Sequence, residues 1–96
     1  MSRVYEMESV LTPGEVTRVD TNKFAAMREA YLAVLPTGRP GLTDPEIRAL
    51  IEPILSQEHF PDGAMAGWWR KGVQLDLEAK GIIGRTLKKP ARFFLL

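Results

Sequence analysis

The stretch GAMAGWWRKGVQLDLEAKGIIGRTLKKPARFFLL, residues 63–96, decides the fold because its hydrophobic period changes part-way along. Up to Gly81 the apolar residues recur at helical spacing, and beyond it they form runs typical of strands. Glycine adopts the left-handed conformation that ends a helix at no steric cost, and Asp62 can cap the first turn. The stretch therefore predicts a long helix near residues 62–80 and a β-hairpin near residues 82–96.

The long helix is predicted to have one wide apolar arc and one narrow polar strip. The arc contains Met65, Ala66, Trp68, Trp69, Gly72, Val73, Leu75, Leu77 and Ala79. The strip, which we expect to face solvent, contains Arg70, Lys71, Gln74 and Glu78. The two tryptophans fall on opposite sides of the centre of the arc. Their position favours one core residue and one partly covered residue over a pair that stacks on bases or binds a partner.

Asp76 projects close to the middle of the apolar arc, where a carboxylate needs partners or must become neutral. Lys80, one turn later, and Arg92, on the hairpin, are the candidate partners. No base or nucleophile accompanies Asp76, so a structural ion pair is favoured over catalysis. We expect this carboxylate to be largely buried and paired with a cation.

The N-terminal residues 1–19 surround the turn signal at residues 12–14 and predict either two short strands or an extended arm. A first helix is predicted near residues 21–35, because apolar residues recur there at helical spacing. Asp20 can cap this helix, and Pro36 ends it.

The second helix has the clearest start signal in the chain. Thr43 and Glu46 form a capping box, which predicts a helix near residues 43–57. Pro53 interrupts the apolar stripe, and its ring kinks or splits the helix there. The loop at residues 37–41 could bring a short extended piece to the base of the hairpin.

The composition indicates a single globular domain of ordinary character. The chain has 96 residues, and its hydrophobic and charged fractions of 45% and 26% are those of soluble folded proteins. No apolar run approaches the length of a membrane span, and no signal peptide is visible. The net charge of +1 is unevenly spread. Residues 62–96 carry seven cations and three carboxylates, a net charge of +4, whereas residues 1–61 have a net charge of −3.

Three segments carry a resemblance to a known fold: LTDPEIRALI, LDLEAKGIIGR and PARFFLL. Together they resemble winged-helix DNA-binding domains, a subset of helix-turn-helix proteins. The resemblance implies an α+β domain at residues 20–96, with a three-helix core and a C-terminal β-hairpin, preceded by an N-terminal arm at residues 1–19. The segments GWWRKGVQLDLEAKG and TPGEVTRVD are also similar to a small family of uncharacterised bacterial proteins, which implies no particular activity.

The winged-helix resemblance implies contacts to duplex DNA from the polar strip and the hairpin. Arginine and lysine can reach guanine or phosphate, and glutamine can read adenine. The predicted nucleic-acid-binding residues are Arg70, Lys71, Gln74, Arg85, Lys88 and Lys89. The alternatives are an ordinary solvated helix face and a hairpin tip whose charges prevent strand pairing with other chains.

Enzyme function is not expected, because the sequence contains no phosphate loop, no nucleophile motif and no cysteine. His59 is the single histidine and has no metal-ligand spacing around it, so we expect no metal and no cofactor. The leading hypothesis is a cytoplasmic, transcription-related DNA-binding protein, dimeric if it is sequence-specific. The alternative is a protein-interaction module that uses the tryptophan flank and the N-terminal arm.

Overall fold

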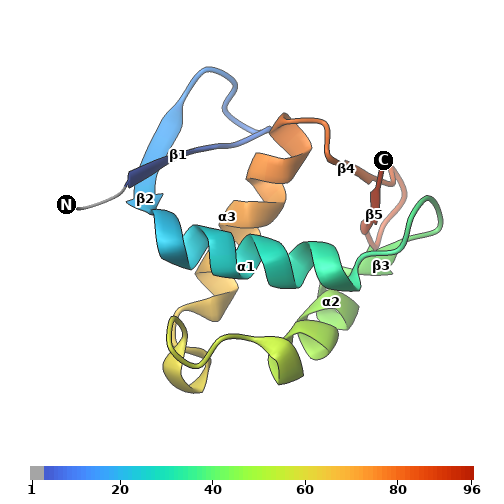
Figure 1. The fold of residues 1–96 in the computed structure, drawn as a ribbon. Helices are drawn as coiled ribbons and strands as arrows, with labels where there is room; N and C mark the ends of the chain where they lie inside the picture. Colours follow the sequence, from blue (N-terminus) through green and yellow to red (C-terminus); the bar gives the residue numbers. More distant parts are fainter. Residues whose placement is uncertain (1–3) are drawn as a thin grey trace.

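The computed structural model describes residues 4–96, and in that part of the chain three α-helices lie between two small antiparallel sheets. Figure 1 shows α1 crossing α3, with one sheet on either side of the crossing. The helices are α1 Thr21–Val34, α2 Asp44–Ile51 and α3 Ala66–Ala79. The strands are β1 Val4–Glu8, β2 Val16–Asp20, β3 Leu42–Thr43, β4 Ile83–Arg85 and β5 Arg92–Leu95. The α+β class with three helices is therefore confirmed.

The C-terminal sheet contains the predicted hairpin and one short strand from the α1–α2 connection. Its order is β3–β5–β4, and both pairs are antiparallel. Leu42 pairs with Phe93, and Thr37 forms an isolated bridge with Leu95. The prediction that the loop after α1 brings an extended piece to the base of the hairpin is confirmed.

The N-terminal residues form a hairpin, one of the two predicted alternatives. Strands β1 and β2 pair antiparallel over five residues each, from Val4 opposite Asp20 to Glu8 opposite Val16. Met7 and Val19 are buried within the core cluster. The inner face of the hairpin therefore packs on the helices.

The helix boundaries differ from the sequence prediction on either side of the α2–α3 turn. α2 ends at Ile51, and Pro53 lies in the 3₁₀ turn η1, Glu52–Ile54, because proline cannot donate the next helical hydrogen bond. The predicted cap at Asp62 is wrong. Asp62 adopts a left-handed conformation (φ 53°) inside the 3₁₀ turn η2, Pro61–Gly63, and α3 begins only at Ala66 without a side-chain cap. The chain uses these residues to reverse direction rather than to start the helix.

The buried face of α3 is rotated from the predicted arc. Trp69, Val73 and Leu77 are in the core, as predicted, but Met65 at the predicted edge is 66% exposed. Trp68 is 48% exposed, so the prediction of one core and one partly covered tryptophan is confirmed. The full set of buried residues on α3 is Trp69, Val73, Gln74, Asp76 and Leu77.

Asp76 is fully buried and paired, as predicted. Lys80 forms its ion pair, and two groups of the N-terminal hairpin add hydrogen bonds. The Tyr5 hydroxyl donates to Oδ2 at 3.1 Å, and the Glu8 backbone N–H donates to Oδ1 at 2.8 Å. Partial burial lowers the pKa of Lys80, but its hydrogen bonds to Asp76 and Tyr5 outweigh this effect and raise the pKa above its ordinary value. The buried Asp76 carboxylate thus joins α3 to β1.

The close approach of the α1–α2 connection to β5 gives a stability prediction. Gly41 has φ +79°, and a Cβ there would lie 2.5 Å from the Phe93 carbonyl oxygen, whereas Gly38 has φ +76° with no atom within 4 Å of its Cβ position. We expect Gly38→Ala to lower the free energy of unfolding by about 1–2 kcal/mol, the cost of a left-handed conformation. Gly41→Ala should cost about 3 kcal/mol or more, because a backbone clash adds to the same conformational cost. Urea denaturation of the two variants measures the difference, and equal losses would contradict this packing.

Candidate nucleic-acid interface

The predicted nucleic-acid-binding residues gather around two adjoining cavities, one where α2, α3 and β4 meet and one between the β4–β5 turn and the α1–β3 connection. Arg70, Lys71, Gln74 and Arg85 line one cavity of about 270 Å³. Lys88 and Lys89 line a second cavity of about 550 Å³ at the hairpin tip. Pro90 borders both cavities, so the six residues occupy one region of the molecule. Their environments within that region differ sharply.

Arg70 does not face solvent freely, as the predicted polar strip requires. Its side chain is 15% exposed, and its guanidinium group forms a two-pronged ion pair with Asp44 at the start of α2. Nε donates to Oδ1 at 3.1 Å, and Nη2 donates to Oδ2 at 3.3 Å. This cation holds α3 against α2.

Gln74 and Glu78 are also turned inward, so the predicted solvent-facing strip is wrong at these positions too. Gln74 is 1% exposed, and its amide donates to Glu78 Oε1 at 2.7 Å. Arg85 of β4 donates to both oxygens of Glu78, at 3.0 and 2.8 Å. Hydrogen bonding to Glu78 raises the pKa of Arg85. Gln74, Glu78 and Arg85 form a polar seam between α3 and β4, because the hairpin folds back over the side of the helix that a helical projection leaves uncovered.

Tyr31 of α1 lies behind this seam. Its side chain is fully buried, and among the described residues its hydroxyl has no hydrogen-bond partner. Burial raises the pKa of the phenol, and the nearby carboxylates of Asp44 and Glu78 raise it further. The hydroxyl therefore stays protonated as a neutral group. Sequence reasoning gave Tyr31 no role in the site, because its spacing in α1 is that of an ordinary core residue.

The exposed cations of the region lie on α3 and around the hairpin tip. Lys71, Lys88 and Lys89 are exposed, and within residues 4–96 none of them forms an ion pair. Arg39, from the α1–β3 connection, lines the tip cavity and lies over the Phe94 ring at 5.4 Å. No signal in the sequence singled out Arg39. Only the sheet pairing brings this residue to a hairpin that begins more than forty residues later.

Arg92 is the fourth cation at the hairpin tip, and its charge is partly neutralised by a carboxylate. It lines the same cavity as Arg39, and its Nη1 lies 3.4 Å from Glu46 Oε1. The tip therefore presents four cations, Arg39, Lys88, Lys89 and Arg92, with one paired carboxylate. A cluster of this sign attracts polyanions.

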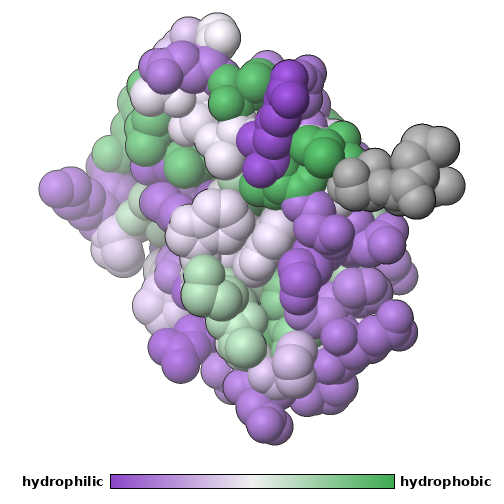
Figure 2. Space-filling model, turned by 90° about the vertical axis from the view of Figure 1, so that its left-hand side faces the viewer, coloured by the Kyte–Doolittle hydropathy of each residue, from purple (hydrophilic) through white to green (hydrophobic). Residues whose placement is uncertain are grey.

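The side of α3 that faces the N-terminal hairpin is apolar rather than basic. Trp68 and Leu75 of α3 and Met7 and Thr17 of the N-terminal hairpin line a mostly apolar groove of about 210 Å³. Lys71 borders this groove as well as the cavity on the hairpin side. Figure 2, which faces the side with the N-terminal hairpin, shows hydrophobic residues gathered in its upper half among hydrophilic ones.

Residues 4–96 contain no cluster of metal-ligating side chains. Within the same range, no helix combines the length and the apolar character needed to cross a membrane. The candidate site consists of the polar seam, the basic tip and the apolar groove.

Comparison with models of protein families shows which family the chain belongs to. Residues 4–93 match the model of DUF6958, a family of unknown function. The chain belongs to this family. The match agrees with the predicted similarity to a small family of uncharacterised proteins. No curated protein and no solved structure matches the chain.

In this DUF6958 member, the polar seam should contribute to stability. Glu78→Ala leaves Arg85 and the buried Gln74 amide without their acceptor, so we expect the free energy of unfolding to fall by about 2–3 kcal/mol. Glu52→Ala is the matched control, because Glu52 also pairs with an arginine but 64% of its side chain is exposed. The control should lose no more than about 0.5 kcal/mol. Similar losses in urea denaturation would contradict the seam.

Proposed function

We propose that this chain is a winged-helix module that binds duplex DNA, mainly through backbone phosphates. Two features of the fold support the winged-helix assignment. The hairpin β4–β5 directly follows the third helix, and β3, which precedes the second helix, pairs with β5 at the base of that hairpin. In such a domain the hairpin is the wing, and α3 is the helix that faces DNA.

The observation that carries the DNA proposal is the basic tip. Arg39, Lys88, Lys89 and Arg92 come from two segments that the sheet brings together, and a single carboxylate offsets them. Lys71 adds an exposed cation on α3 near the same region. Positive side chains on an exposed loop suit phosphate contacts, which supply most of the affinity of non-specific DNA binding.

Base reading by α3 is not part of the proposal. Gln74 is buried against Glu78, and Arg70 is held by Asp44. Reading a base edge would require Gln74 to leave the largely buried Glu78 and Arg70 to leave its two-pronged pair with Asp44, at a cost that a base contact of about 1–3 kcal/mol does not exceed. We therefore expect weak sequence preference.

A salt titration tests the proposal. With Lys71, Lys88, Lys89 and Arg39 each neutralising one phosphate, log K against log salt should have a slope of roughly −3.6. Lys88→Ala/Lys89→Ala should flatten the slope by roughly 1.8 and weaken binding to all duplexes alike. Fluorescence anisotropy with mixed-sequence duplexes at several salt concentrations measures both quantities.

The control variant is Arg18→Ala/Arg28→Ala, which removes the same charge from β2 and α1, away from the tip. It should leave the slope unchanged. DNA binding is refuted if the unmodified protein does not bind at about 50 mM salt and micromolar DNA, where non-specific contacts alone register. A control variant that weakens binding as much as the lysine pair would instead show that net charge, not the tip, is responsible.

A second candidate function is protein binding, which the groove beside Trp68 favours. A tryptophan with 48% of its surface exposed, next to an apolar groove, is typical of interaction sites. A second copy of the chain is the simplest partner to test. Sedimentation velocity should then detect a concentration-dependent dimer that Trp68→Ala abolishes, and a monomer at all concentrations would exclude self-association.

A further inference from the structure

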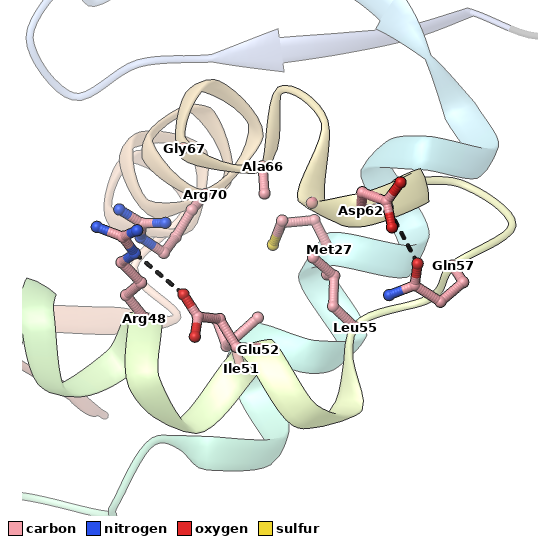
Figure 3. Close-up of a pocket in the computed structure, with 11 residues that line it drawn as sticks. Met27, Arg48, Ile51, Glu52, Leu55, Gln57, Asp62, Ala66, Gly67 and Arg70 are labelled. Carbon is pink, nitrogen blue, oxygen red and sulfur yellow. Dashed lines mark hydrogen bonds and ion pairs between the residues drawn. The ribbon is translucent and has the colours of Figure 1, made fainter.

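A cavity of about 490 Å³ lies between α2 and the start of α3, away from the basic tip (Figure 3). The long connection between these helices wraps around it, so that residues of η1 and η2 contribute to its walls. At its base Met27, Ile51 and Leu55 are largely buried, and Ala66 adds a small apolar surface, while the rest of the lining is mainly polar. The volume is within the range of small-molecule sites.

One wall of the cavity carries unused hydrogen-bond donors. Figure 3 shows Arg48 and Arg70 on the same side of the cavity. Arg48 donates to Glu52 through Nε, and among the described residues its two terminal nitrogens have no partner. Arg70 uses Nε and Nη2 for Asp44, which leaves Nη1. Guanidinium groups with spare planar donors are suited to a carboxylate.

The opposite wall limits the charge of a ligand. Asp62 and Gln57 lie there in Figure 3, and the Gln57 side-chain oxygen accepts from the Asp62 backbone N–H at 3.0 Å. The carboxylates of Asp62 and of Glu52, which lines the cavity and pairs with Arg48, would repel a second negative group. A ligand that suits both walls and the base has one anionic end and an uncharged, apolar body.

We propose that this cavity binds a small monocarboxylate with an aliphatic body. The carboxylate lies against the spare nitrogens of Arg48 and Arg70, and the body lies toward Leu55 and Ala66. The site is distinct from the proposed DNA contacts, none of which is made by Arg48 or Arg70.

The test is a titration of the isotope-labelled full chain with hexanoate, followed by NMR. Hexanoate should shift the amide resonances of residues around the cavity, such as Gly63 and Gly67, in a saturable way. Hexanamide, the uncharged analogue, should bind at least about tenfold more weakly, because it lacks the charge-assisted hydrogen bonds. Equal binding of the two compounds, or no saturation by about 20 mM hexanoate, would overturn the proposal.

Two variants locate the effect. Arg48→Gln removes an arginine whose side chain is 65% exposed, so the fold should persist, and hexanoate affinity should fall about tenfold. Arg18→Gln, whose side chain is 77% exposed on β2, is the matched control and should bind as the unmodified protein does. Unchanged affinity in Arg48→Gln, or an equal loss in both variants, would mean that hexanoate does not bind at this wall.

Discussion

The buried carboxylate of Asp76 constrains the whole N-terminal side of the molecule. A charge in a fully buried position is tolerated only with partners, and Asp76 takes them from Lys80, from the Tyr5 hydroxyl and from the Glu8 backbone. Two of the three belong to β1, so the carboxylate is satisfied only when the N-terminal hairpin is docked. Tyr5 in turn stacks on Phe24 of α1, with ring centroids 4.0 Å apart. The hairpin thereby links the first and third helices.

A second set of polar groups, buried or partly buried, fixes the other side of α3. Glu78 accepts from Gln74 and Arg85, and Arg70 is paired with Asp44, so the helix is tied to β4 and to α2. Removing one partner from the buried part of this network, Gln74 and Glu78, would leave a buried polar group without its hydrogen bond. The outer surface that remains for contacts is narrow and is centred on Lys71.

Much of the fold could be predicted from local signals. The capping box at Thr43 starts α2, and Gly81 follows the end of α3 with φ +70°, the conformation that glycine permits. The inward direction of Asp76 follows from helical periodicity alone. The start of α3 was not predicted, because the turn before it runs through left-handed conformations at Asp62, Gly63 and Met65 that no periodicity or capping signal indicates.

The candidate site was harder to predict, for one physical reason. A helical projection separates apolar from polar residues but does not show that a later hairpin will cover the polar side. Gln74 and Glu78 therefore look solvent-facing in sequence, although Gln74 is buried against Glu78 and Glu78 accepts from Arg85. The hairpin lysines could be predicted because a turn signal places them at a tip. For Arg39 only the approach of its loop to the base of the hairpin was predicted, because its position at the tip cavity depends on the register of pairing between distant strands.

Arg70 forms a common wall between the large α2–α3 cavity and the small cavity beside β4. This guanidinium group lines both cavities and pairs with Asp44, which lines the small one. A ligand in the large cavity that attracts the Arg70 guanidinium group would weaken its ion pair with Asp44 in the small cavity. By thermodynamic linkage such an effect is reciprocal: an occupant on one side changes affinity on the other by the same factor in both directions. In a domain of 96 residues, two surfaces on different faces of α3 can in this way be coupled through a single side chain, without any change of fold.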